Sequence, residues 1–170
     1  EKWPTRWVVA DDVGLGKTIE AGLILTPLVA SGRVRRVLVL CPASLVGQWQ
    51  QRLREMFGIH AFRYVREIDT AGDAFWAAHP FVVASMETLR KDDEQKGWHD
   101  RLLSAPAWDL VLVDEAHRLG DDEQRGPTLG YKLLTKLQEE GLISSLIFFT
   151  GTPHRGQNFA FLSLLRLIDE

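Results

Sequence analysis

The stretch VVADDVGLGKTIEAGLIL, Val8–Leu25, places an apolar run before a glycine-containing turn and a helical pattern after it. Gly14 and Gly16 let backbone N–H groups approach an anion, because neither residue carries a Cβ. The helix that follows would direct the positive end of its dipole at the same anion. Lys17 would reach the β- and γ-phosphates of a nucleotide, and the Thr18 hydroxyl would bind Mg²⁺. The stretch therefore predicts a phosphate-binding loop.

This loop matches only the second half of the pattern G-x-x-x-x-G-K-[ST], because Asp11 stands where the first glycine belongs. A GxGKT segment alone also occurs in ordinary loops. The strand pattern before it and the helical pattern after it favour the phosphate-binding interpretation.

Apolar runs alternate with helical patterns along the rest of the chain. The runs are rich in Val, Ile and Phe without polar alternation, which is typical of strands covered on both faces. This alternation predicts an α/β fold with a mostly parallel sheet and helices on both faces. Right-handed crossovers would place all βα turns along one sheet edge. The expected strands are Arg6–Ala10, Val34–Cys41, Phe81–Ser85, Leu110–Asp114 and Leu146–Thr150, with Ala61–Val65 as a shorter one. The expected helices are Lys17–Ala30, Leu45–Phe57, Ala71–Ala78, Gly97–Ser104, Gly130–Glu140 and Asn158–Ile168.

A second motif, WDLVLVDEAH at Trp108–His117, ends an apolar strand with two acids. A nucleotide hydrolase needs one acid to hold hydrated Mg²⁺ and another to orient and deprotonate the attacking water. Asp114 suits the metal and Glu115 the water, because adjacent strand residues point in opposite directions. The alternative is a pair of acids that cap the next helix. His117 follows the metal ligand by three residues, which favours a coupling role.

A third motif, LIFFTGTPHRG at Leu146–Gly156, is an expected strand that leads into small hydroxyl residues. Thr150 and Thr152 would sense whether a γ-phosphate is present and pass the difference on by hydrogen bonding. A β-turn explains this segment equally well.

Composition sets the class of protein. With 170 residues, 45% of them hydrophobic, the chain can form one globular core, and no apolar run is long enough to cross a membrane. The lone Cys41, in the apolar run VLVLCP, fits a reducing compartment, so we expect the cytosol. We expect Trp49 to pack on the sheet from its helix.

Charge is unevenly distributed. The net charge is −3, yet the segment Arg33–Arg66 holds seven arginines against one acid, a local balance of +6. This is a weak indication of nucleic-acid binding, and arginines on solvated faces explain it as well.

The three motifs in this order resemble the superfamily-two helicase-like ATPases. The form ADDVGLGKTIEAGLIL is similar to the Swi/Snf family, as are LVLCPASLVGQWQQRL at Leu38–Leu53 and ASMETL at Ala84–Leu89. Within that family the chain most resembles the bacterial branch that includes the RNA-polymerase-associated recycling ATPase. The resemblance covers nearly the whole chain and implies a RecA-like P-loop NTPase domain, the first of two lobes.

The resemblance also implies roles for individual residues. Lys17, Asp114 and Glu115 would be catalytic, with Thr18 and Asp114 as the magnesium ligands. His117, Thr150 and Thr152 would couple hydrolysis to movement. The ATP-binding residues would be Asp12, Gly14, Leu15, Gly16, Lys17 and Thr18. The path of a nucleic-acid backbone would run along Pro42, Ser44, Gln48, Ser85 and Met86.

Two arginines of the basic segment, Arg52 and Arg54, would add to that path. Arg33, Arg35 and Arg36 would not, because they enter their strand at the end opposite the βα turns.

The expected function is ATP-driven translocation along nucleic acid, most simply double-stranded DNA, by residues 1–170 as a helicase ATP-binding domain. Its cofactors would be ATP and magnesium, and its partners a second RecA-like lobe and a protein such as RNA polymerase. Two alternatives stay open. One is a strand-separating DEAH helicase on DNA or RNA, and the other is a nucleotide-dependent assembly switch that acts on a protein partner.

Overall fold

A computed structural model describes residues 5–10, 16–72, 74–90, 95–119, 128–151 and 165–168. Within these residues six parallel strands form one sheet in the order β1-β6-β5-β2-β4-β3. The strands are β1 (Arg6–Ala10), β2 (Val37–Cys41), β3 (Phe62–Arg63), β4 (Phe81–Ser85), β5 (Trp108–Val113) and β6 (Ile143–Thr150).

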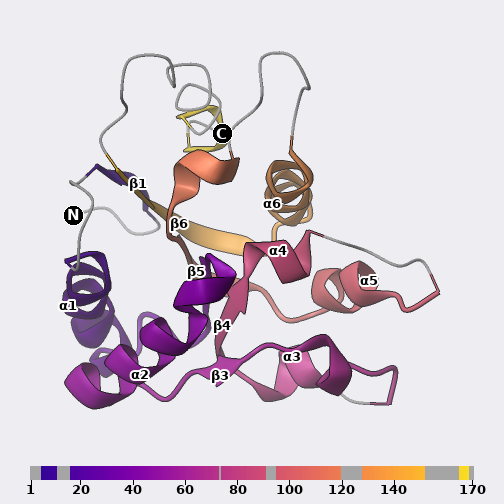
Figure 1. Cartoon of the computed structure of the whole chain (residues 1–170), viewed down its shortest axis with the longest axis horizontal. Coiled ribbons are helices and arrows are strands. Elements are labelled where there is room, and N and C mark those ends of the chain that lie inside the picture. Colours follow the sequence, from indigo (N-terminus) through magenta and orange to yellow (C-terminus); the bar gives the residue numbers. More distant parts are fainter. Residues whose placement is uncertain are drawn as a thin grey trace.

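Helices connect the strands and cover both faces of the sheet. The α-helices are α1 (Lys17–Ala30), α2 (Val46–Phe57), α3 (Phe75–Ala78), α4 (Met86–Leu89), α5 (Trp98–Leu103) and α6 (Leu129–Glu139). Short 3₁₀ turns are η1 (Ala43–Leu45), η2 (Arg66–Ile68) and η3 (Ala116–Leu119). Figure 1 shows the strands between α1 and α2 on one side and α5 and α6 on the other. The predicted α/β fold is confirmed.

Two hydrophobic clusters fill the space between the sheet and its helices. On one face, residues of α1 and α2 such as Leu25 and Leu53 pack against alternate strand residues, including Val39 and Phe149. On the other face, residues of α3, α5 and α6 pack against the intervening strand positions, such as Leu40. A strand that is buried on both faces carries no polar alternation, which explains the continuous apolar runs of the sequence.

The sheet begins and ends at slightly different residues than the sequence predicts. β2 starts at Val37 rather than Val34, because the backbone N–H groups of Arg35 and Arg36 donate to Asp109 Oδ2 at 2.7 and 2.9 Å. β5 and β6 start earlier than predicted, at Trp108 and Ile143, and they pair with each other there.

Three shorter elements also differ from the prediction. β3 is only Phe62–Arg63, and α3 starts at Phe75 rather than Ala71. In the last expected helix, residues 158–164 lie outside the described residues and residues 165–168 are helical.

The amino edge of the sheet holds the arginines that were excluded from the nucleic-acid path. Arg36 donates from Nη2 to the carbonyl of Trp76 at 2.6 Å, and its guanidinium lies 4.4 Å from the ring centroid of Trp108. Arg36 therefore anchors structure at the edge opposite the βα turns, as predicted from topology.

Cys41 is buried at the end of β2, and burial raises the pKa of its thiol above the usual value. Among the described helices, none has both the length and the apolar composition that crossing a bilayer requires.

Candidate active site

The amino end of α1 holds the first two predicted site residues. Gly16 is the N-cap residue, and as a glycine it has no side chain with which to cap the helix. The backbone N–H groups of the first turn of α1 lie at the positive end of the helix dipole. Lys17 and Thr18 are each 6% exposed. The predicted loop residues Asp12, Gly14 and Leu15 lie outside the described residues.

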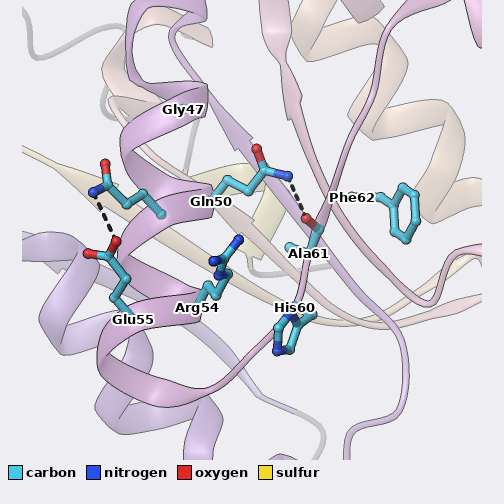
Figure 2. A pocket seen from close by; sticks show the side chains of 8 residues that line it. Gly47, Gln50, Arg54, Glu55, His60, Ala61 and Phe62 are labelled. Carbon is cyan, nitrogen blue, oxygen red and sulfur yellow. Dashed lines mark hydrogen bonds between the residues drawn. The ribbon is translucent and has the colours of Figure 1, made fainter.

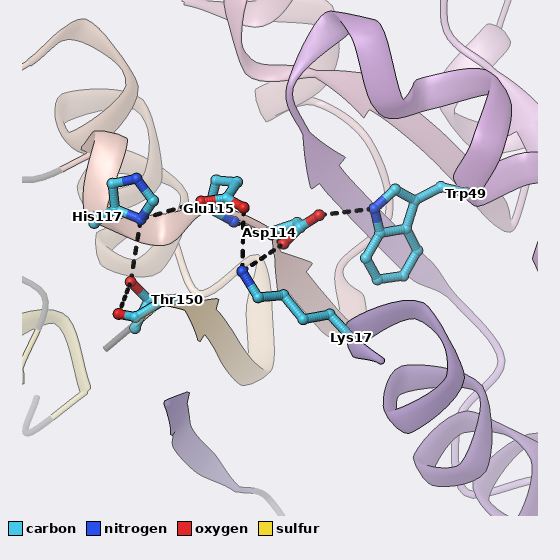
Figure 3. Close-up of polar contacts among 7 residues, drawn as sticks. Lys17, Trp49, Asp114, Glu115, His117 and Thr150 are labelled. Carbon is cyan, nitrogen blue, oxygen red and sulfur yellow. Dashed lines mark hydrogen bonds and ion pairs between the residues drawn. The ribbon is translucent and has the colours of Figure 1, made fainter. Parts of the chain in front are cut away.

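The acid pair meets Lys17 at the carboxyl edge of the sheet. Lys17 Nζ lies 3.1 Å from Glu115 Oε1 and 3.9 Å from Asp114 Oδ1. Figure 3 shows the lysine reaching from α1 toward both carboxylates. Lys17 lies 97 residues before Asp114 and 98 before Glu115, and the parallel sheet brings their βα turns together. The predicted convergence of lysine and carboxylates is therefore present.

The two acids do not separate in the way that the sequence suggested. β5 ends at Val113, so Asp114 and Glu115 lie in the turn that follows the strand. Glu115 has a φ of 51°, in the left-handed region, which costs a non-glycine residue roughly 1–2 kcal/mol. Because the chain has left the extended conformation, both carboxylates face Lys17 rather than opposite sides. Strained backbone of this kind collects at functional sites.

Asp114 is held by two N–H donors. The indole Nε1 of Trp49 donates to Oδ2 at 2.9 Å, and the backbone N–H of Glu115 donates to Oδ1 at 2.8 Å. The expectation that Trp49 packs on the sheet is confirmed, since its exposed fraction is 1%. Its bond to Asp114 was missed because nothing in the sequence relates two residues that lie 65 positions apart.

His117 bridges the acid pair and the end of β6. Its Nδ1 lies 3.2 Å from Thr150 Oγ1 and 3.3 Å from Glu115 Oε2. Thr150 Oγ1 donates its own proton to the Gly151 carbonyl, so Nδ1 of His117 is the donor to both neighbours. Burial, the largest cause, lowers the pKa of His117, although Glu115 acts in the opposite direction. Thr152, the other predicted coupling residue, lies outside the described residues.

The residues predicted for the nucleic-acid path follow β2 and β4. Ser44 is exposed on η1, and Gln48 is half-buried on α2. Pro42 is buried, and Met86 packs against the core. The Ser85 hydroxyl caps α4 by accepting from Thr88 N at 3.0 Å. All five lie at the edge that holds Lys17 and the acids, and Ser44 and Gln48 offer polar groups to solvent.

Two hollows lie along this edge. One, of about 230 Å³, is lined by residues that include Pro42, Met86, Asp114 and Glu115, so it joins the acid pair to the predicted path. The other, of about 250 Å³, is lined by residues that include Arg63 and Ser85.

Arg54 does not face either hollow. With Gln50, His60 and Phe62 it lines a separate cavity of about 410 Å³ between α2 and β3 (Figure 2). None of the predicted path residues lines that cavity.

The site carries more negative than positive charge, because one lysine faces two carboxylates and burial disfavours the charged form of His117. Within the described ranges, no group of three or more His, Cys, Asp or Glu side chains could hold a metal by itself. Mg²⁺ commonly takes only one or two carboxylates and completes its shell with water and phosphate oxygens. The donor set of Thr18 and Asp114 beside the amino end of a helix fits a magnesium–nucleotide.

A parallel sheet that brings an N-terminal helix lysine and two carboxylates to one edge defines a RecA-like α/β domain. The chain belongs to the family of the SNF2-related domain, whose family model matches residues 6–170.

Proteins similar in sequence to this chain come from bacteria. It is similar to the RNA polymerase-associated protein RapA of Pseudomonas syringae pv. tomato, with 36% identity over 169 residues and 96% of the chain covered. The RapA of Pseudomonas aeruginosa is 34% identical over 174 residues, covering 99% of the chain. The chain spans 17% of the length of each of these relatives.

Solved structures share the fold. The Sulfolobus solfataricus SWI2/SNF2 ATPase core domain gives a TM-score of 0.73 at 19% identity, over 97% of this chain and 31% of that one. The same organism's core in complex with dsDNA gives 0.69 at 22% identity, over 96% and 31%. The Pyrococcus furiosus Hef helicase domain gives 0.63 at 20% identity, over 97% and 33%.

Proposed function

We propose that this chain is the ATP-binding lobe of a translocase that couples ATP hydrolysis to movement along double-stranded DNA. The observation that carries the proposal is the meeting of Lys17 Nζ with Glu115 Oε1 and Asp114 Oδ1, at 3.1 and 3.9 Å, beside the amino end of α1. Membership of the SNF2-related family supports it.

Each residue of the site takes a role that its position suits. The N–H groups at the start of α1 and the Lys17 ammonium would bind the phosphates of ATP. Thr18 and Asp114 would hold magnesium, which neutralises phosphate charge when bound. Glu115 would orient the attacking water and accept its proton. Lys17 now holds Glu115 at 3.1 Å, so binding of phosphates to Lys17 would release that carboxylate for the water.

Coupling to movement would run through His117. Its Nδ1 contacts both Glu115 and Thr150, so a change at the acid reaches the end of β6 in one step. Thr152 would extend this link from beyond the described residues.

The proposed binding partners are inferred from the position of the path residues and from the names of the relatives. Pro42, Ser44, Gln48, Ser85 and Met86 would follow the sugar–phosphate backbone of DNA without reading its sequence. A second RecA-like lobe would close over the nucleotide and supply arginine. RNA polymerase is the proposed protein partner, because relatives are named for that association, and the proposed location is the bacterial cytosol or nucleoid.

The proposal is tested with the full-length protein that contains this chain, by measuring ATP turnover with and without duplex DNA. Lys17→Ala should lower kcat on the order of 10³-fold or more, since it removes the charge that meets the transferred phosphoryl group. Glu115→Gln should abolish turnover but keep nucleotide binding. Lys132→Ala on the exposed face of α6 is the matched control and should leave turnover unchanged.

The same preparation separates the alternatives. A translocase displaces a third strand from a triplex without melting a tailed duplex, whereas a strand-separating helicase melts the tailed duplex. ATP turnover that is indifferent to DNA and RNA would contradict the proposal and favour the assembly switch.

A further inference from the structure

The indole of Trp49 contacts Asp114, the proposed magnesium ligand. Trp49 is the fourth residue of α2, and its Nε1 donates to Asp114 Oδ2 at 2.9 Å (Figure 3). The exposed fractions are 1% for Trp49 and 8% for Asp114, so water does not compete for this hydrogen bond. A hydrogen bond to a charged carboxylate is among the strong ones, and the low local dielectric strengthens it further.

The hydrogen bond from Trp49 fixes which oxygen of Asp114 faces Lys17, where the phosphates would bind. Oδ2 is held by the indole, whereas Oδ1 accepts from Glu115 N at 2.8 Å and faces Lys17 Nζ at 3.9 Å. An indole N–H can donate but not accept, so Asp114 Oδ2 is the acceptor in this bond. Asp114 therefore has little freedom to rotate away from Lys17.

Burial of a tryptophan does not by itself require such a bond in this protein. Trp76 and Trp108 are 3% and 0% exposed, and the Nε1 of each has no hydrogen-bond partner among the described residues. The core therefore accommodates these two indoles without a hydrogen bond to Nε1. Trp49 also packs, against Phe149 at a centroid distance of 6.5 Å, but it has a specific polar contact in addition.

Trp49 shares a rigid element with the proposed nucleic-acid path. Gln48 is its neighbour on α2, and Ser44 lies on η1 immediately before the same helix. Because η1 runs directly into α2, a displacement of η1 by a bound sugar–phosphate backbone would be passed to the indole that holds Asp114.

We propose that Trp49 is a positioning residue that orients the Asp114 carboxylate for magnesium and links the Ser44–Gln48 segment to that carboxylate. The inference rests on the proposed function, since it concerns the same site. It assigns a mechanical link through α2 that is separate from the His117–Thr150 contact on the other side of the acid pair.

The test compares Trp49→Phe with Trp108→Phe in the full-length protein. Each change removes one buried indole N–H, but only the first removes a hydrogen bond, and Trp108 lies on the strand that leads to Asp114. The first readout is binding of a fluorescent ADP analogue during a Mg²⁺ titration, without DNA. Trp49→Phe should raise the half-maximal Mg²⁺ concentration about 10-fold, as loss of a residue that orients a metal ligand typically does. Trp108→Phe should leave it unchanged.

Two further measurements exclude a general loss of structure. ADP binding in EDTA should be the same in both variants and the wild type, because Lys17 and the end of α1 are intact. With DNA, Trp49→Phe should lower the maximal stimulated kcat while the DNA concentration for half-maximal stimulation stays unchanged. Replacement of Trp49 by β-(3-benzothienyl)alanine, which has sulfur in place of N–H, keeps the ring shape and should reproduce the Mg²⁺ shift.

The outcomes are distinguishable. If Trp49→Phe and the benzothienyl variant titrate with Mg²⁺ like the wild type, Trp49 only packs and the inference is wrong, whereas the proposed function stands. If the wild type itself shows no Mg²⁺ dependence of nucleotide binding, the proposed function fails.

Discussion

The protonation of His117 is coupled to the stability of the fold. It lies half-buried between Glu115 and Thr150, and burial lowers its pKa below the ordinary value of about 6.5. As the pH falls below about 6.5, the unfolded chain takes up the proton before the folded one does. The contribution of His117 to the free energy of unfolding should therefore be fully present above about pH 6.5. It should decrease as the pH falls toward the lowered pKa of His117.

Thermal unfolding of the chain between pH 7.5 and 5.5 checks this expectation. The Tm of the wild type should fall across the range, and His117→Gln should make the fall smaller. His60→Gln removes an exposed imidazole and serves as the control. An equal fall in the wild type and in His117→Gln would show that the environment of His117 does not set this pH dependence.

At the scale of helices, alanine substitutions at two glycines of the α1–α2 pair should change the free energy of unfolding in opposite directions. A Cβ at Gly22 on α1 would lie 2.0 Å from Phe57 Cε2, whereas a Cβ at Gly47 on α2 would meet nothing within 4 Å. Gly22→Ala should destabilise by about 1–3 kcal/mol, because overpacking outweighs the better helix propensity of alanine. Gly47→Ala should stabilise by about 0.5–1 kcal/mol through that propensity alone.

Urea denaturation of both variants gives the two free-energy changes. Combining Gly22→Ala with Phe57→Ala should restore most of the lost stability, because the smaller side chain removes the clash. A neutral Gly22→Ala would mean that the Phe57 ring swings away at no cost and that the close approach of α1 to α2 is not required.

The sequence predicted elements well where one local pattern decides them. β1, α1 and β4 have the predicted ends, because apolar runs and turn residues mark them along the chain. The meeting of Lys17 with the acids also followed, since parallel strands bring their βα turns to one edge. These predictions depend on the order of the motifs along the chain and not on distances between side chains.

The remaining features depend on contacts between distant residues. The start of β2 is set by Asp109, which takes the N–H groups that a longer strand would have paired. The Trp49–Asp114 bond joins two motifs that have no relation in sequence. The left-handed Glu115 was missed because the carboxylates were assigned by strand alternation, although the strand ends at Val113.

At the scale of the whole molecule, we predict that the chain alone binds nucleotide weakly and hydrolyses it negligibly. In the proposed site, the Lys17 ammonium and the backbone N–H groups at the start of α1 would meet the phosphates, and arginine fingers would come from the proposed second lobe. Such a finger typically contributes 10³–10⁵ in rate, so the turnover of the isolated chain should be lower by about that factor. A steady-state ATPase assay of residues 1–170 beside the full-length protein measures this. DNA-stimulated turnover by the chain alone would contradict it.

The strand order has a consequence for synthesis on the ribosome. Among the described strands, β1 pairs only with β6, from Arg6 beside Leu146 to Ala10 beside Thr150, and it precedes the stretch predicted to bind phosphate. Because translation delivers β6 some 140 residues after β1, the nascent chain must hold its first strand without a partner until nearly all of the domain has emerged. Strands β5, β2, β4 and β3 pair without β6, so a chain interrupted before β6 keeps these four strands but leaves β1 without its partner.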